Sequence, residues 1–354
     1  MAGGLEKNIV LLANHLARCG NQVSLITFDL PRANAFYEIE PSVHWHQVAR
    51  TPPHSSIGFW QRLKMLRRIR RVLMDANRPV VVCFHHGVLL RFAAASIGLR
   101  LPLICSERNS LTLYDHIRQS KWSVGFLMLS FIKRITVQFP SYIRDYPIWM
   151  RGRIRVIPNP VFPAAKYARP DQPGPGGRFR LLNVGRLCAQ KNQRMLIDAF
   201  AAVCERNPLW DLIIIGDGEI SQELAAHVRE LGLAARIFLR GKQRDVSAML
   251  VSSQLYCITS KWEGFPNALA EAMAHGLPSI GLRSCAGVRD LIIDGVSGCL
   301  VDPHELSRAL DMLMNDDQCR AQMGRAAVEA MTRYAPIAVF DRWENLFSEV
   351  ETSR

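Results

Sequence analysis

The chain has 354 residues, of which 49% are hydrophobic and 21% charged. These proportions exclude an intrinsically disordered or collagen-like chain, and the length is sufficient for two domains that each bury a core. The formal net charge of +13 fits an anionic partner such as nucleic acid, a membrane surface or a phosphorylated substrate. No zinc-finger spacing, Gly-aromatic RNA-binding motif or basic tail is present, so nucleic-acid binding is not expected.

The nine cysteines are scattered singly, without a Cys-x-x-Cys pair or histidines at metal-binding spacing. This pattern predicts reduced thiols in a cytoplasmic protein and no zinc site. The longest apolar run, 124–132, is too short to span a bilayer, and no secretory signal is recognisable.

The first half of the chain predicts alternating helices and short strands. In chain order we expect a helix over 5–18, strands over 22–27 and 43–48, a helix over 58–75, strands over 80–84 and 101–105, a helix over 125–135, and strands over 136–139 and 153–157.

The helix expected over 58–75 is both amphipathic and basic. Arginine and lysine lie between helix-spaced apolar residues, and this pattern suits contact with an anionic membrane surface or with the pyrophosphate of a lipid carrier. A core-packed helix with a solvated basic face would have the same pattern. The apolar positions are Phe59, Leu63, Leu66, Ile69 and Leu73.

Polar residues follow two of these strands. His85 and His86 come after the strand 80–84, and Glu107 and Arg108 come after the strand 101–105. Ligands of parallel sheets bind at the carboxyl ends of strands. Arg108 keeps its charge and suits a phosphate, but it is no general base. A local ion pair between Glu107 and Arg108 is the alternative, and the two histidines are expected to be structural.

The second half follows a segment, 158–177, that is rich in proline and glycine. Six strands then alternate with helix-length segments, which predicts a doubly wound parallel sheet with right-handed crossovers. The strands are expected over 180–184, 211–215, 237–239, 255–259, 279–282 and 299–301.

Two loops of this half carry candidate ligands for phosphate. Arg186 and Lys191 lie five residues apart after the first strand. The guanidinium can make a fork of two bonds and the ammonium supplies a point charge, so both can converge on one diphosphate. Gly216 follows the second strand and is expected in a tight turn.

The segment 260–282 predicts a strand end, a loop, a helix and another strand. Pro266 is expected as the first helical residue, and Gly276 ends the helix. The helix N-terminus favours a phosphate, while the carboxylates of Glu263 and Glu271 can accept hydrogen bonds from pairs of hydroxyls. A nucleotide sugar has this layout, although two solvated surface glutamates would show the same spacing.

This segment closely resembles the donor-site signature of retaining glycosyltransferases of the GT-B fold, glycosyltransferase family 4. The pattern E-G-F-P-N-A-x-x-E-A-M-A-x-G-x-P is matched from Glu263 to Pro278. The loop from Gly185 to Asn192 is similar to the G-R-x-x-x-x-K loop that binds the donor diphosphate in that family. Glu107-Arg108-Asn109 resembles a bacterial subgroup that extends surface polysaccharides.

The resemblance implies an α/β GT-B fold of two Rossmann-like, doubly wound domains facing a cleft. We expect an acceptor-binding domain over 1–160, a linker over 161–178, a nucleotide-sugar-binding domain over 179–332, and a C-terminal helix over 333–354 that packs back on the first domain. In that family a strand precedes the turn that Gly3 and Gly4 resemble. None precedes them here, so we expect the native start upstream of Met1, or else a first domain that lacks this strand.

The implied activity is that of a retaining hexosyltransferase without a cofactor or metal. It transfers a hexose or N-acetylhexosamine from a nucleotide diphosphate sugar, expected to be a UDP sugar, to an undecaprenyl-linked or oligosaccharide acceptor. The protein would be cytoplasmic and peripheral at the inner face of the plasma membrane. Arg186, Lys191 and Glu263 are the catalytic candidates, and the substrate-binding candidates are Gly3, Gly4, Glu107, Arg108, Gly185, Gly216, Gly264, Phe265, Pro266, Asn267, Ala268 and Glu271.

Two alternatives remain open from the sequence. A transferase for a soluble acceptor would be active without lipid and would not bind anionic vesicles. A non-catalytic relative would bind the sugar nucleotide without turnover.

Overall fold

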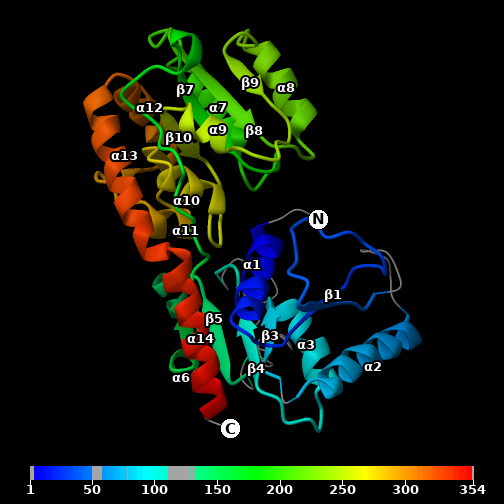
Figure 1. The fold of residues 1–354 in the computed structure, drawn as a ribbon. Helices are drawn as coiled ribbons and strands as arrows, with labels where there is room; N and C mark the ends of the chain where they lie inside the picture. The colour runs from blue at the N-terminus through cyan, green and yellow to red at the C-terminus, as the bar shows by residue number, and fades with distance from the viewer. Residues whose placement is uncertain (1–3, 50–57, 78, 111–128, 130–131, 353–354) are drawn as a thin grey trace. The chain divides into compact units, whose positions relative to one another are not determined.

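The computed structural model describes residues 4–49, 58–77, 79–110, 129 and 132–352. The chain divides into two compact units, one of Met1–Asn159 with Ile337–Arg354 and one of Pro160–Pro336. Both units combine helices with parallel β-sheets (Figure 1). The α/β class predicted from the sequence is therefore confirmed.

The described strands of the first unit form two parallel sheets, β1-β2 and β3-β4-β5-β6. Within the described residues, β1 and β3 each have a ladder partner on one side alone. The elements are α1 (Gly4–Arg18), β1 (Val23–Thr27), β2 (Val43–Gln47), α2 (Phe59–Asp75), β3 (Val81–Phe84), α3 (His86–Ala95), β4 (Leu103–Ser106), β5 (Arg134–Val137), η2 (Pro140–Asp145), α6 (Ile148–Arg151), β6 (Ile154–Val156) and α14 (Pro336–Thr352).

Two features of this unit differ from the sequence-based expectation. Helix α3 was not predicted, and it begins directly after β3 with His85 as its N-cap. The helix expected over 125–135 lies mostly outside the described residues. Its last two positions are strand, because Ile135 pairs with both Cys105 of β4 and Ile154 of β6.

Helices α1 and α14 share one hydrophobic core with the four-stranded sheet. Leu12 of α1 packs in a buried cluster with Ile104 of β4 and with one face of α14. That face repeats at helical spacing, as a core-facing stripe does. Its members are Val339, Phe340, Trp343, Leu346 and Val350.

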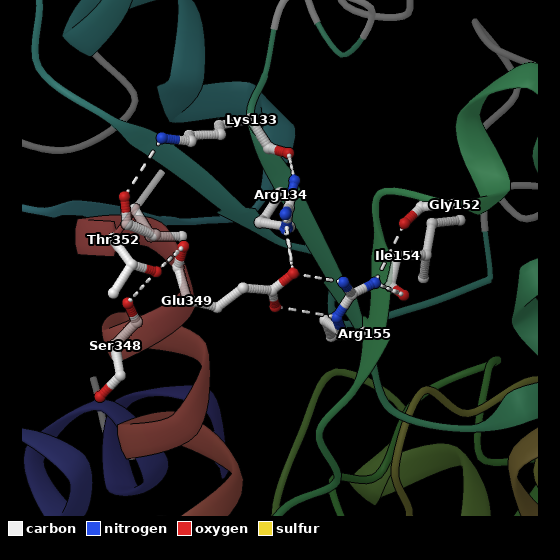
Figure 2. A network of polar contacts seen from close by, with 9 residues as sticks. Lys133, Arg134, Gly152, Ile154, Arg155, Ser348, Glu349 and Thr352 are labelled. Carbon is white, nitrogen blue, oxygen red and sulfur yellow. Dashed lines mark hydrogen bonds and ion pairs between the residues drawn. The ribbon is translucent and has the colours of Figure 1, made fainter. Parts of the chain in front are cut away.

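Polar contacts also hold the C-terminal end of α14. Figure 2 shows the Glu349 carboxylate between two guanidinium groups from neighbouring strands. It accepts hydrogen bonds from Arg134 Nη2 at 2.7 Å and from Arg155 Nε at 3.0 Å. Hydrogen bonds from Arg155, and then from Arg134, hold the pKa of Glu349 below its ordinary value. The helix is thus tied to β5 and β6 by charge as well as by packing.

The second unit contains a six-stranded, fully parallel sheet of order β12-β11-β10-β7-β8-β9. Its elements are η3 (Pro175–Gly177), β7 (Phe179–Val184), α7 (Gln193–Ala201), β8 (Trp210–Ile215), α8 (Ser221–Glu230), β9 (Ile237–Leu239), α9 (Ser247–Val251), β10 (Leu255–Ile258), α10 (Asn267–Ala274), β11 (Ser279–Leu282), α11 (Ala286–Leu291), β12 (Gly298–Val301), η4 (Pro303–Glu305), α12 (Leu306–Met314), α13 (Asp317–Met331) and η5 (Thr332–Tyr334).

The strand order of this sheet creates a topological switch point between β7 and β10. From β7 the chain moves outward through β8 to β9, whereas from β10 it moves the opposite way through β11 to β12. The loops that leave the carboxyl ends of β7 and β10 diverge to opposite sides. Open parallel sheets bind their ligands at this position.

Residues 161–178, expected as a linker, are part of the second unit in the structure. The Ala168 amide donates to the His275 carbonyl at 2.8 Å, and Arg320 Nε donates to the Pro170 carbonyl at 2.8 Å. Arg320 is fully buried, with its guanidinium about 5 Å from the rings of Phe179 and Trp210. Backbone hydrogen bonding, which composition does not reveal, holds this proline-rich segment in place.

The network around Glu349 generates a prediction on stability. Glu349→Gln is expected to lower the free energy of unfolding of the first unit by about 1 kcal/mol at pH 7, the upper end for partly exposed pairs. Because the folded-state pKa is depressed, this stabilisation is present above the ordinary pKa of 4.5 and is lost as pH falls through the folded-state value.

Urea unfolding at pH 7 and at pH 3 measures this effect. The matched control is Glu351→Gln on the same helix, where the exposed carboxylate has no ion pair with a described residue. Equal stability of the two variants at pH 7 would contradict the assignment.

Candidate functional site

The loops after β7 and β10 are joined by hydrogen bonds. The Lys261 amide donates to the Gln190 carbonyl at 2.8 Å, and Gln190 Nε2 donates to the Trp262 carbonyl at 2.8 Å. Thr259 Oγ1 donates to the Asn192 carbonyl at 2.9 Å. The two loops at the switch point therefore form one surface.

Lys191 and Glu263 meet on that surface. Lys191 Nζ forms an ion pair with Glu263 Oε1, and Ser260 Oγ donates to the same oxygen at 2.7 Å. The Glu263 side chain is 8% exposed and that of Lys191 is 24% exposed. A carboxylate with so little access to water is stable only when it is paired and hydrogen-bonded. The structure thus brings together two residues that the sequence singled out separately.

Arg186 lies five residues before Lys191 and is exposed. Its carbonyl accepts a hydrogen bond from Gln193 Nε2 at 2.9 Å, which fixes the backbone of the loop. No acceptor for its guanidinium is present among the described residues. This cation is consequently available to an anionic ligand.

The loop after β8 supports the loop after β7 through backbone contact. Gly216 has a φ of +147°, and a Cβ there would lie 1.8 Å from the Gly185 carbonyl oxygen. A Cβ at Gly218 would lie 2.2 Å from the Leu187 carbonyl oxygen. At Gly185 itself a Cβ would be in ordinary contact with Lys191, at 3.7 Å. Gly216 and Gly218 are therefore the positions that require glycine, and the sequence had indicated Gly216 alone.

Helix α10 begins one residue later than predicted. Pro266 is its N-cap, not its first helical residue, because a ψ of 82° is outside the helical region. The Pro266 carbonyl accepts a hydrogen bond from the Ala270 amide at 3.0 Å, and the Pro266 side chain itself makes no capping bond. Gly264 and Pro266 are buried, and Phe265 packs edge-to-face on Tyr334, with ring centroids 5.6 Å apart.

The remaining candidates of this segment lie on the partly accessible side of α10. Asn267, Ala268 and Glu271 are half-buried. Leu269, Ala272 and Met273 are buried, as their spacing predicted. The helix thus presents Glu271 outside the core, two turns after Glu263.

Cys285 lies near this pair but is no nucleophile. Burial, and then the charge of Glu263, raise the pKa of the Cys285 thiol to about 12. The reactive form of cysteine is the thiolate. The thiol therefore remains protonated and unreactive at neutral pH.

In the first unit, Glu107 is a buried acceptor at the end of β4. Its Oε1 accepts from the His86 amide at 2.9 Å and lies 3.0 Å from His86 Nδ1. Cys105 Sγ is 3.4 Å from the same oxygen. The expected alternative, an ion pair of Glu107 with Arg108, is not the arrangement found. Through this hydrogen bond Glu107 holds the start of α3 against β4. Its role in the structure is to position that helix.

Arg108 follows Glu107 in the chain, and one nitrogen of its guanidinium group has no hydrogen-bond partner. Its Nη1 donates to Asn159 Oδ1 at 2.8 Å, and its guanidinium is 4.8 Å from the centre of the Phe84 ring. Its Nε is buried without a hydrogen-bond partner. Burial lowers the pKa of Arg108 to about 10, so the group is charged at neutral pH.

Of the two glycines at the start of the chain, the structure describes only Gly4. Gly3 lies outside the described residues. Gly4 is exposed and begins α1, and its carbonyl accepts from Asn8 Nδ2 at 2.7 Å.

Among the described residues, no helix is both long and apolar enough to cross a bilayer.

Comparison with known proteins identifies the family. The model "Glycosyl transferase 4-like domain" matches residues 3–160, and "Glycosyl transferases group 1" matches residues 167–330. The structure of Anabaena HepE in complex with UDP superposes with a TM-score of 0.77 at 18% identity, covering 98% of this chain and 96% of HepE. The amylovoran biosynthesis glycosyltransferase AmsD of Erwinia amylovora is 31% identical, covering 98% of this chain and 96% of AmsD. The chain belongs to the GT-B glycosyltransferases.

This glycosyltransferase also resembles an enzyme with a named acceptor. The GalNAc-alpha-(1->4)-GalNAc-alpha-(1->3)-diNAcBac-PP-undecaprenol alpha-1,4-N-acetyl-D-galactosaminyltransferase of Campylobacter jejuni is 25% identical, covering 99% of this chain and 97% of that enzyme. The GT-B fold and the transfer of glycosyl groups, both implied by the sequence resemblance, are confirmed by these comparisons.

The close contact at Gly216 gives a prediction. Gly216→Ala is expected to destabilise the second unit by about 2 kcal/mol or more, because the Gly185 carbonyl has to move and the backbone is strained. The control is Gly232→Ala, where φ is +70° but nothing lies within 4 Å of the added Cβ. It measures the cost of a left-handed backbone without a steric clash, about 1 to 2 kcal/mol. Urea unfolding measures the loss in the free energy of unfolding for both variants. Equal losses would show that the contact with Gly185 does not contribute to the effect at Gly216.

Proposed function

We propose that this glycosyltransferase transfers a hexose or N-acetylhexosamine from a UDP sugar to a lipid-linked or polysaccharide acceptor with retention of anomeric configuration. The observation that supports it most is the Lys191–Glu263 pair at the switch point between β7 and β10, next to the start of α10. At this position one ligand would contact the cations Arg186 and Lys191 and the carboxylates Glu263 and Glu271.

The second unit would hold the donor. Arg186 and Lys191 would bind the diphosphate together with amides at the start of α10. Glu263 and Glu271 would accept hydrogen bonds from hydroxyls of the sugar and the ribose, since carboxylates offer acceptors and no donors. The UDP in the complex of HepE, which has the same fold, supports a nucleotide diphosphate as the ligand.

The chemistry would depend on stabilising the leaving group. The bond from the sugar anomeric carbon to the diphosphate oxygen breaks, and its electron pair leaves with the diphosphate. The acceptor hydroxyl forms the new bond on the same face and gives its proton to the departing diphosphate. Fixed cations and amide groups aimed at that developing charge lower the barrier. With these groups in place, we propose that transfer needs no divalent cation.

The first unit would bind the acceptor near the end of β4. Arg108 has a buried Nε without a partner, and such a donor is stabilised by an anionic oxygen. A pyrophosphate-linked acceptor supplies that oxygen. The Campylobacter relative, whose name specifies a PP-undecaprenol acceptor, supports this choice.

Helix α2 would place this unit on an anionic membrane. Its buried face carries Met65, Ile69 and Leu73. On its exposed face, three cations have no ion pair with a described carboxylate, and they lie between apolar residues at the two ends. This combination is typical of interfacial helices. The exposed stripe consists of Trp60, Lys64, Arg67, Arg71 and Met74.

Loss of the donor contacts gives the direct test of the proposed chemistry. Lys191→Ala and Glu271→Ala are each expected to lower transfer by about 10- to 150-fold, the range for one charged hydrogen bond made in the transition state. The assay uses a panel of UDP sugars with an undecaprenyl pyrophosphate-linked sugar as acceptor, and it reads the anomeric configuration of the product.

Lys261→Ala is the matched control, since Lys261 is an exposed lysine of the adjoining loop after β10 that bonds to the Lys191 loop through its backbone amide. Normal turnover in Lys191→Ala would refute the site. Turnover only with soluble acceptors would support the first alternative, and donor binding without any product would support a non-catalytic relative.

The membrane proposal is tested by a triple substitution. Replacement of Lys64, Arg67 and Arg71 by alanine is expected to weaken binding to vesicles of anionic lipid roughly 100-fold, at about 1 kcal/mol per cation. A control with the same change in net charge replaces Arg229, Arg308 and Arg325 in the second unit. Equal losses in the two triple variants would show that net charge alone, and not α2, drives binding.

A further inference from the structure

A group of metal-type ligands lies on α1 and α14, within the first unit. His15 lies in the last turn of α1, Cys19 directly follows the helix with its amide bonded to the His15 carbonyl at 3.0 Å, and Glu344 faces them from α14. Residues four apart on a helix lie on the same face. The third side chain comes from 325 residues further along the chain. The sequence-based expectation of no zinc site rested on local spacing and could not include this group.

The distances within the group are close to those that zinc requires. His15 Nε2 is 2.7 Å from Glu344 Oε1, while Cys19 Sγ is 3.7 Å from His15 Nε2 and 3.8 Å from Glu344 Oε1. Around a tetrahedral Zn²⁺, the nitrogen and oxygen ligands are about 3.4 Å apart and the sulfur is about 3.6 Å from each. Opening the contact between His15 and Glu344 by less than an ångström therefore creates the site.

The three ligands are held in place by the helices that carry them. The His15 ring stacks on the Phe340 ring of α14, with centroids 4.2 Å apart and planes at 14°. Leu12 of α1 and Trp343 of α14 pack in one buried core beside the group. Arg18, the nearest cation on α1, forms an ion pair with Glu40. The ligand set is thus oriented before any ion arrives, which lowers the entropy cost of binding.

The group is also open to solvent. The side chains of His15 and Glu344 are 26% and 46% exposed, and Cys19 is exposed. An ion can enter directly, and water can complete the coordination as a fourth ligand.

We propose that His15, Cys19 and Glu344 form a Zn²⁺ site that clamps α1 to α14. On binding, the Cys19 thiol releases its proton to solvent and coordinates as the thiolate, while neutral His15 and the Glu344 carboxylate exchange their mutual hydrogen bond for bonds to the ion. Thiolate, imidazole and carboxylate together are a donor set that zinc accepts. The proposal does not depend on the transferase chemistry, which uses other residues.

Cobalt titration of the full chain is the test, because Co²⁺ in a thiolate site gives a charge-transfer absorption band in the near ultraviolet. We expect the band to saturate at one Co²⁺ per chain and to disappear on addition of Zn²⁺. Cys19→Ser is expected to abolish the band. Cys319→Ser, which removes the other cysteine that is not buried, is the matched control and is expected to leave the band unchanged.

Two further variants measure the other ligands. Glu344→Gln and His15→Gln are each expected to weaken Zn²⁺ binding at least about tenfold, the smallest effect typical of changes around a metal site. Zn²⁺ is expected to raise the thermal unfolding temperature of the wild type and not that of Cys19→Ser. No saturable band in the wild type, or a band that survives Cys19→Ser, would overturn the proposal.

Discussion

The ion pair between Lys191 and Glu263 is the contact on which the proposed donor site of the second unit depends. The Glu263 side chain is 8% exposed, and its carboxylate is paired with Lys191 and accepts a hydrogen bond from Ser260. The pair links the loops that diverge at the switch point of the sheet, and backbone packing of Gly216 on Gly185 holds the same surface from the next strand. Within the proposed donor site, the charges of Lys191 and Glu263 are therefore held in position before a ligand binds.

The sequence predicted much of this surface because its signals are local. The strands around it and the buried stripe of α10 follow from periodicity, and Lys191 and Glu263 were singled out by their motifs. Their direct contact, across 72 residues, was not predictable, since it depends on the order of strands in the sheet. The burial of Arg320 and the hydrogen bond from the His86 amide to Glu107 were missed for the same reason: tertiary partners decide whether a charged residue is solvated or enclosed.

The two units use charge in different ways. In the second unit, Lys191 is paired with Glu263, while no described residue accepts a hydrogen bond from the exposed Arg186 guanidinium. In the first unit, Arg108 is enclosed by Phe84 and Asn159, and Lys64, Arg67 and Arg71 of α2 are exposed. The net charge of +13 is thus distributed over separate features. We infer that these match the different anionic parts of a donor, a lipid-linked acceptor and a membrane surface.

The most direct measurement of the central claim is a crystal structure of this glycosyltransferase with a UDP sugar bound. The account predicts diphosphate oxygens within about 3.2 Å of Lys191 Nζ and of the Arg186 guanidinium, hydrogen-bonding distance for a charged pair. It also predicts a ligand hydroxyl on the Glu271 carboxylate. A nucleotide bound elsewhere, with Arg186 and Glu271 contacting only water, would contradict it.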